Sequence, residues 1–280
     1  MKSTFLLLLV SLLPATLHAQ YPLDYKRDRQ WLFGINYWGG QSRLDFNTEP
    51  PTVHALNIPD ALGYCRTQAI VCDTAGQVKL SCNGENFGGP DFRDLPFVSP
   101  LNYGITGFGS GTFDRETCII LPLGDGSEKY YVIHSNGFPV RLPNTNLMYG
   151  GKGLRYGIID MDMNNGRGGA LFTDSLLVND TLTIGGLVAC RHANGRDWWI
   201  LTTRFGSRLV SRFLVTPYGI TRQGTQPLTH PIEFNAVGQA SFSPDGTKFA
   251  DFRNTFTTPV KLNIFDFDRC TGLLSNQQHY

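Results

Sequence analysis

Four turn signals, each between two runs of strand-forming residues, recur along the chain and most constrain its fold. Their corner glycines are Gly76 in "VCDTAGQVKLSC", Gly126 in "LGDGSEKYY", Gly195 in "CRHANGRDWW" and Gly246 in "FSPDGTKFA". Asn-Gly and Asp-Gly tolerate the positive φ angles of short hairpins, so they are strong hairpin signals. The corners lie 50, 69 and 51 residues apart (76 to 126, 126 to 195, 195 to 246), and the long interval carries the insertion "NGFPVRLPNTNLMYGGKG".

A second hairpin pattern follows three of these corners, in "RYGIIDMDMNNGRGGALF", "RFLVTPYGITRQ" and "VKLNIFDFDRCTGLLS". Two linked hairpins make a four-stranded antiparallel meander. A meander repeated about every 40 to 50 residues is typical of a β-propeller. A β-sandwich also has short strands and frequent turns, but turn order and strand order recur together here. We therefore predict an all-β fold, a β-propeller built from four-stranded antiparallel blades.

The first residues have the layout of a secretory signal peptide. Lys2 supplies a positive start, an apolar run covers 5–13, and Ala19 offers a small residue for cleavage. A spanning helix needs roughly 20 apolar residues, and Pro14 interrupts this run. We predict a signal peptide over 1–19 and no membrane span after its removal. The product is expected to be exported to the periplasm, the cell surface or the medium.

Residues 20–280 are predicted to form one β-propeller-like domain. Its parts are an N-terminal segment over 20–61 and about four blades over 62–275. The chain ends in "SNQQHY", just past a hairpin pattern, so the propeller is expected to be incomplete and truncated at the C-terminus. An open propeller leaves a blade face and a strand edge exposed, which favours aggregation.

The net charge bears on nucleic-acid binding, and the cysteines bear on disulfide formation and zinc binding. A formal net charge of +1 without Lys/Arg clusters argues against nucleic-acid binding. In an exported chain, cysteines form disulfides or buried thiols, and no zinc-type cysteine or histidine pair is present. With the first turn centred near Ala75, Cys72 faces about Lys79, which disfavours a Cys72–Cys82 bridge. The disulfide candidates, which allow 15 pairings with none preferred, are Cys65, Cys72, Cys82, Cys118, Cys190 and Cys270.

Local motifs for chemistry are weak. "DMDMNNG" at 160–166 lacks the glycine and glutamate of a calcium loop. Its alternation, with Ile159, Met161 and Met163 on one side, favours a strand with a buried face. His192 and Asp197 flank a turn and could belong to a Ser-His-Asp hydrolase, which needs a nucleophile elbow. The stretch "GFGSGTF" at 107–113 lacks the spacing of such an elbow, so we expect His192 to hydrogen-bond within its blade. No Gly-Lys-Ser/Thr follows the glycines of 104–111, so no phosphate cradle is predicted. We predict no catalytic, metal or cofactor site.

Aromatic residues could form a sugar-stacking platform or pack between blades. Adjacent Trp198 and Trp199 must point to opposite faces of a strand, so at least one is expected between blades. We favour core packing over a glycan platform for the set Trp31, Trp38, Tyr130, Tyr131, Trp198 and Trp199.

The order of motifs resembles exported proteins of Bacteroidota in which an N-terminal β-propeller-like region precedes surface-associated modules and a type IX secretion sorting domain. "HANGRDWW" followed about fifty residues later by "SPDGTKFA" is the most specific match; Ser-Pro-Asp-Gly alone is shared with Tol-Pal-type and WD-repeat propellers. The resemblance implies a location and a role class, but no reaction. Further blades and a sorting domain are not visible. The remaining matching pieces are "WLFG", "LDFN", "DTAGQVKLSCNG", "YYVIHS", "GLRYGIIDMDMN" and "FDFDRCTGLLSN".

The first functional hypothesis is an exported, non-catalytic propeller that presents its loops and central funnel to a protein or glycan ligand at the cell envelope or surface. The alternative is a polysaccharide hydrolase or lyase whose carboxylates come from separate blades. A third hypothesis is that the truncated chain has no activity by itself. The oligomeric state stays open. Carboxylates that the alternative could use are Asp114, Glu116, Asp125 and Glu128.

Overall fold

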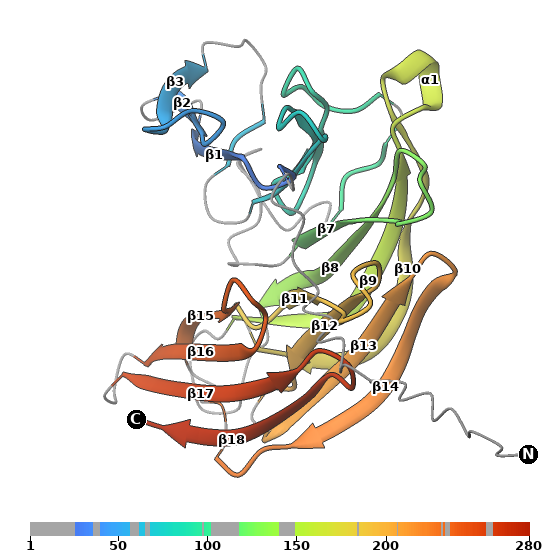
Figure 1. Ribbon diagram of the computed structural model, residues 1–280. Helices are drawn as coiled ribbons and strands as arrows, with labels where there is room; N and C mark the ends of the chain where they lie inside the picture. Colours follow the sequence, from blue (N-terminus) through green and yellow to red (C-terminus); the bar gives the residue numbers. More distant parts are fainter. Residues whose placement is uncertain are drawn as a thin grey trace, which may run out of the picture.

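The chain is built almost entirely of antiparallel β-strands (Figure 1). The structure, a computed structural model, describes residues 26–35, 40–56, 62–64, 68–96, 98–101, 118–139, 149–183, 185–205, 207–230, 232, 236–255 and 260–280. Within these ranges the single α-helical turn is α1 (Met163–Gly166). No helix in the described ranges is long and apolar enough to cross a membrane.

Five antiparallel sheets follow one another along the described chain. The first two sheets have three strands each, and the last three have four strands each, in chain order. The architecture of four-stranded antiparallel blades is thus confirmed for the last three sheets. The strands are β1 (Gln30–Ile35), β2 (Gly40–Asp45), β3 (Thr52–Leu56); β4 (Ala69–Cys72), β5 (Val78–Cys82), β6 (Phe87–Gly88); β7 (Cys118–Pro122), β8 (Lys129–Pro139), β9 (Tyr149–Asp160), β10 (Gly169–Leu182); β11 (Val188–Arg191), β12 (Trp198–Thr203), β13 (Leu209–Thr216), β14 (Gly219–Pro227); and β15 (Ala236–Phe242), β16 (Lys248–Thr255), β17 (Lys261–Asp268), β18 (Leu273–His279).

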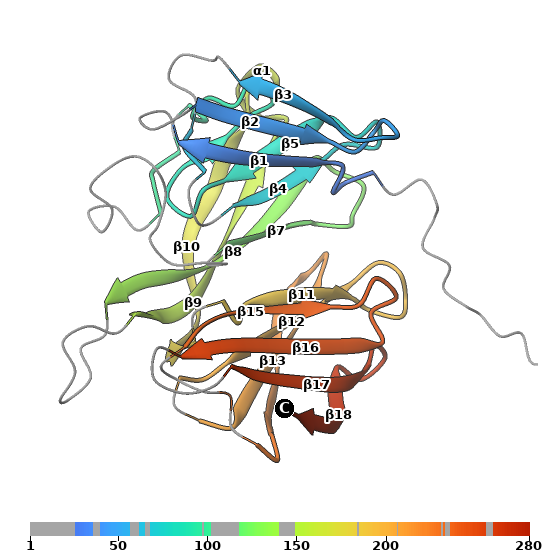
Figure 2. The same ribbon diagram turned by 90° about the vertical axis from the view of Figure 1, so that its left-hand side faces the viewer.

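The sheets are arranged as blades of an open propeller. The first strand of each of the last four sheets (β4, β7, β11 and β15) stands at one end of its sheet's strand order, and β4 contacts β7 while β11 contacts β15. Figure 2 shows the β1–β3 sheet and the β15–β18 sheet at opposite ends of the array. These two sheets lie apart in Figure 2, so the described strands do not close into a ring.

The four predicted corners are all turns with positive φ: Gly76 (82°), Gly126 (87°), Gly195 (74°) and Gly246 (70°). In each turn an Asp or Asn side chain accepts a hydrogen bond from a backbone N–H two residues further on, as turn-forming Asx residues do. The four acceptors and donors are Asp73 with Ala75 (2.8 Å), Asp125 with Ser127 (2.9 Å), Asn194 with Arg196 (3.0 Å) and Asp245 with Thr247 (3.0 Å). The local turn signal in the sequence therefore works through the same contact in all four of these hairpins.

The turn at Asp245 predicts a pH dependence of stability. Hydrogen bonds from the Ser243 hydroxyl and from Thr247 lower the pKa of Asp245 to about 2. A depressed folded-state pKa stabilises the fold above the unfolded value of 3.8, and this contribution is lost as the pH falls toward 2. We expect Asp245→Ala to be less stable than wild type at pH 6, with the gap narrowing between pH 4 and pH 2. Urea unfolding across this range measures the gap, and a gap independent of pH would contradict the assignment.

The predicted second hairpins are present in the last three sheets. The structure corrects the prediction that "DMDMNNG" lies on a strand with Ile159, Met161 and Met163 on one buried face. β9 ends at Asp160, and of the three only Ile159 (0 % exposed) and Met161 (2 % exposed) are buried. Asn164 and Asn165 then take positive φ angles of 54° and 59°, so Met163 lies in the turn of α1 and not on the strand. Two consecutive left-handed asparagines end an extended run, because αL is open to Asn at low cost.

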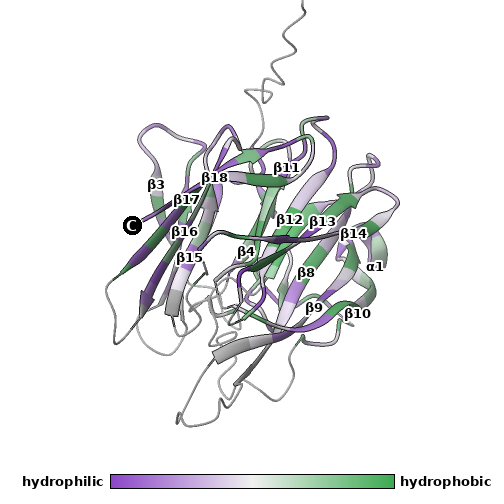
Figure 3. Cartoon of the chain, turned by 90° about the horizontal axis from the view of Figure 1, so that it is seen from below, coloured by the Kyte–Doolittle hydropathy of each residue, from purple (hydrophilic) through white to green (hydrophobic). Residues whose placement is uncertain are grey.

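Packing between sheets accounts for most of the aromatic side chains. Trp199 is buried between the β11–β14 and β15–β18 sheets, where its Nε1 donates to the Arg269 carbonyl (2.8 Å), while Trp198 on the other face is half-buried. Tyr130 and Tyr131 are also buried, so core packing is confirmed for Trp199 and the two tyrosines. It is wrong for Trp31, which is 50 % exposed, and Trp38 lies outside the described ranges. In Figure 3 β12 and β13 are largely hydrophobic, whereas β18 carries a long hydrophilic portion.

The outer face of the first sheet is apolar and open. Trp31 and Phe33 on β1 are 50 % and 40 % exposed, and Val53 on β3 is 70 % exposed. Trp31 packs on Phe46, with ring centroids 5.2 Å apart. Leu32, from the opposite face of β1, is fully buried against the β4–β6 sheet. An exposed apolar blade face is what an open propeller leaves at its end.

Candidate functional site

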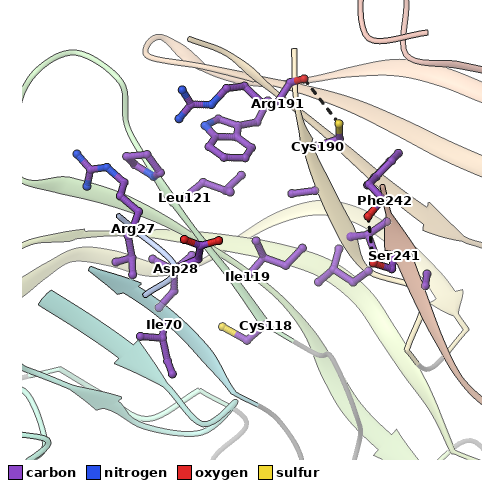
Figure 4. A pocket seen from close by; sticks show the side chains of 18 of the residues that line it. Arg27, Asp28, Ile70, Cys118, Ile119, Leu121, Cys190, Arg191, Ser241 and Phe242 are labelled. Atoms are coloured by element: carbon purple, nitrogen blue, oxygen red, sulfur yellow. Dashed lines mark hydrogen bonds between the residues drawn. The ribbon is translucent and has the colours of Figure 1, made fainter. Parts of the chain in front are cut away.

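The first strands of four sheets line a common cavity of about 650 Å³ (Figure 4). The lining includes the ends of β7 and β11, at Pro122 and Arg191, and Pro244, just beyond the end of β15. The volume lies in the range of roughly 300–1,000 Å³ that is usual for ligand pockets. We call this cavity the central channel; it is the candidate functional site.

The wall of the central channel is apolar. Ile70 comes from β4, Ile119 and Leu121 from β7, Ala189 from β11 and Phe242 from β15. The sequence explains this: "AIVC", "CIILP" and "LVAC" are short uninterrupted apolar runs. Strands packed on both faces have such runs, and the first strand of a blade lies between two neighbouring sheets.

Charged groups stand at the rim where the first hairpins turn. Arg27 is held beside β4, since its carbonyl accepts from the Cys72 N–H (2.8 Å) and its Nη1 donates to the Cys72 carbonyl (3.5 Å). The neighbouring Asp28 is exposed and also lines the channel, next to Ile119 in Figure 4.

Arg191 supplies a second guanidinium at the rim. Its Cζ lies 4.7 Å from the centroid of the Trp198 ring, and its Nη1 donates to the Gly195 carbonyl (2.9 Å). Stacking on an aromatic face leaves a guanidinium charged and orients it. With Arg27 and Asp28, the described rim carries two positive charges and one negative charge.

The thiols at the channel are held mainly in the protonated form. Burial raises the pKa of the Cys190 thiol to about 11. A hydrogen bond with the Cys82 thiol, together with burial, raises the pKa of Cys118 well above its ordinary value. Because the thiolate is the reactive form, both thiols react slowly at neutral pH and neither is suited to act as a general base.

The cysteine candidates fall into different environments. Four of them are buried free thiols, Cys270 is an exposed free thiol, and Cys65 lies outside the described residues. Cys82 faces Ala69, and Cys72 faces Val78 after a β-bulge, so the expected Lys79 was wrong by one residue. A direct Cys72–Cys82 cross-strand pair is absent from this hairpin, as predicted. The buried four are Cys72, Cys82, Cys118 and Cys190.

The two carboxylates considered for sugar hydrolysis that the structure describes, Asp125 and Glu128, do not line the channel. Asp114 and Glu116 lie outside the described ranges. Asp125 accepts two hydrogen bonds from Ser127, which lower its pKa, whereas a general acid needs a raised one. Glu128 is paired with Lys79 at 3.1 Å. Neither Asp125 nor Glu128 lines the channel.

His192 joins two sheets. Its Nδ1 accepts from the Asn194 N–H (3.0 Å) within the turn, but its Nε2 lies 3.2 Å from the Cys270 carbonyl in the next sheet. The expectation of bonds within one blade was therefore incomplete. Asp197 is held by Arg196, at 2.8 Å, which lowers its pKa.

Two further features considered in the sequence were a metal-binding group of side chains and the glycine-rich stretch over 104–111. No three His, Cys, Asp or Glu side chains within the described part of the chain are grouped so that they could hold a metal ion. The glycine-rich stretch over 104–111 lies outside that part.

Sequence reasoning missed the three rim charges. Arg27 and Asp28 belong to a segment of the chain before the first repeat, and nothing local in the sequence connects them with β4. Arg191 was within reach, because it directly follows the apolar run of a first strand and precedes a predicted hairpin corner. Its position at the end of such a strand places it at the channel rim.

Comparisons with known proteins identify no family. No family model matches the chain, and no curated protein matches it. Among solved structures, a candidate 6-phosphogluconolactonase from Bacteroides uniformis ATCC 8492 is similar at 17 % identity and a TM-score of 0.39, covering 89 % of this chain and 82 % of that one. A second candidate 6-phosphogluconolactonase, from Bacteroides fragilis NCTC 9343, has 13 % identity and a TM-score of 0.40, covering 89 % and 81 %.

TolB from Acinetobacter baumannii is similar at 11 % identity and a TM-score of 0.20, over 84 % of this chain and 64 % of that one. Identities and scores at this level say nothing about activity or ligand. The description of the fold as a propeller therefore depends on the strand order and sheet arrangement given above.

Proposed function

We propose that the chain is a non-catalytic binding module that holds an extended segment of a protein partner in the central channel. The observation that carries the proposal is the channel itself, an apolar wall of first strands with guanidinium groups at one rim. Few, well-placed polar groups around an apolar pocket are the usual form of a ligand site. An apolar peptide segment with an acidic group near one end fits this arrangement.

Strand edges support a peptide over a glycan. β4, β7, β11 and β15 are each the terminal strand of their sheets, so each has one edge that no neighbouring strand of its sheet covers. Such edges offer backbone groups to an extended chain. A glycan in the channel would need an open aromatic face there. Of the aromatic residues that line the channel, Trp198 lies under Arg191, and Phe242 packs on Phe249 with ring centroids 5.2 Å apart.

The proposed place of action is outside the cytoplasm, at the cell envelope or surface. Support comes from the signal-peptide pattern over 1–19 and from the sequence resemblance to exported Bacteroidota proteins. The intact mass of the native product, recovered separately from periplasm, cell surface and medium, tests the location. Recovery only from the cytoplasm with residues 1–19 retained would contradict it.

Selection from a phage-displayed library of random short peptides tests the binding proposal. We expect apolar peptides with an acidic residue, bound with a dissociation constant of about 1 μM. Ala189→Phe fills the channel and should weaken binding about tenfold or more, a loss near 1.4 kcal/mol. Ala250→Phe, at another half-buried alanine on β16 that does not line the channel, is the matched control and should bind as wild type.

Three further results would separate the peptide proposal from its alternatives. Saturable binding on a glycan array without peptide binding would overturn the peptide proposal. Release of reducing ends from a polysaccharide panel, lost in a variant carrying Asp125→Asn and Glu128→Gln, would favour the hydrolase alternative. Equal peptide affinity in Ala189→Phe and wild type would move the site away from the channel.

A further inference from the structure

Two of the buried cysteines lie where two neighbouring sheets pack together. Cys82 is the last residue of β5, and Cys118 is the first residue of β7 in the next sheet, and β5 contacts β7. They are 0 % and 4 % exposed and belong to the same core cluster between the two sheets. Hydrogen bonding to Cys82, together with burial, raises the pKa of the Cys118 thiol, in agreement with this placement. A disulfide needs two cysteines that are neighbours in the folded chain, and these two are neighbours across the sheet boundary.

The other cysteines of the described residues lack such a neighbour. Cys72 is in a separate cluster with Leu32 and Val78. Cys190 points its thiol toward the Gly246 carbonyl, 3.9 Å away. Cys270 is exposed at a hairpin end. Shared packing between neighbouring sheets therefore favours the Cys82–Cys118 pairing among those that the sequence leaves open.

The central channel gives an oxidant access to this pair. Cys118 lines the channel and is labelled in Figure 4, whereas Cys82 does not line it. The Cys118 side chain is 4 % exposed and Cys82 is fully buried, so a small disulfide that enters the channel reaches Cys118 before Cys82. Thiol–disulfide exchange proceeds through such a sequence of one accessible and one resolving thiol.

We propose that Cys82 and Cys118 form a disulfide that fastens the β4–β6 sheet to the β7–β10 sheet when the protein meets an oxidising compartment. The oxidant is a disulfide, either a small molecule or a protein. The Cys118 sulfur, as thiolate, attacks it and forms a mixed disulfide, releasing one thiol. The Cys82 sulfur then displaces the second half of the oxidant. Two thiols and one disulfide give one new disulfide and two reduced thiols, with both protons passing to the released thiolates.

Peptide mapping tests the pairing on the wild-type protein. The chain is purified reduced, treated with oxidised glutathione, unfolded with an alkylating agent and digested with trypsin without reduction. Cleavage after lysine and arginine gives fragments 80–93 and 116–129, each with a single cysteine. We expect these two fragments linked, and about 2 Da lost from the intact mass, for the two hydrogens removed.

Two variants give the matched comparison. Cys190→Ser removes another buried channel thiol and should leave the 80–93 to 116–129 link unchanged. Cys82→Ser should leave fragment 116–129 alkylated or as a glutathione adduct. Linkage of Cys118 to any other cysteine, or full alkylation of both thiols after oxidation, would overturn the proposal. Mapping the wild type decides the matter even if Cys82→Ser does not fold. Peptide binding in the channel is a separate measurement, so either result can fail alone.

Discussion

Replacing Trp199 by alanine is expected to lower the free energy of unfolding by about 3–5 kcal/mol, the cost of truncating a large aromatic side chain in a core. The indole lies between two blades, and Gly272 of the last hairpin packs directly on its ring. The substitution also leaves the Arg269 carbonyl without the Nε1 donor. Urea unfolding followed by far-UV circular dichroism measures the loss.

Trp198→Ala is the matched control, since the two residues are adjacent and of the same size. Trp198 is half-buried and has Arg191 over its ring, so its loss should cost about 1 kcal/mol, the scale of an exposed cation–π contact with modest burial. Equal losses for the two variants would contradict the assignment of Trp199 as the residue that joins the β11–β14 and β15–β18 sheets.

Breaking the buried ion pair of β16 is expected to cost about 3–5 kcal/mol. Asp251 and Arg253 are both 0 % exposed, and the Arg253 Nε donates to Asp251 Oδ1 at 2.9 Å. The two residues are two apart on a strand and so share one face. In Asp251→Leu the guanidinium loses its carboxylate in the interior, and in Arg253→Met the carboxylate loses its guanidinium.

The double variant Asp251→Leu with Arg253→Met separates the pair from its surroundings. Removing both charges leaves no uncompensated ion, so the double variant should be more stable than either single variant. Chemical denaturation of the four proteins completes the cycle. Additive losses would contradict a direct coupling. Arg253 also donates to the Gly185 carbonyl (3.4 Å), and the double variant reports the loss of that bond.

The blade hairpins could be predicted because their signals are local. Gly76, Gly126, Gly195 and Gly246 each occupy a positive-φ position that other residues rarely adopt, and an Asp or Asn nearby completes the turn. Opposite faces for Trp198 and Trp199 follow from the strand period alone. These contacts lie within a few residues of each other, so one sequence is enough to expect them.

The channel and its neighbours could not be predicted in the same way, since their partners are far apart along the chain. Arg27 reaches Cys72 across 45 residues. Cys118 meets Cys82 only once two sheets have packed. Asp251 and Arg253 are charged residues on an alternating strand, where exposure is the ordinary expectation. They are buried because distant backbone, at Gly186 and at Gly238, packs against Arg253.

Hydrogen–deuterium exchange with a selected peptide bound tests the central claim, that the channel between the first strands is the ligand site. We expect slower exchange at amides of β7, β11 and β15, which line the channel, with β14 and β18 unchanged. Slower exchange confined to β14 or β18, with the first strands exchanging as in the free protein, would contradict it.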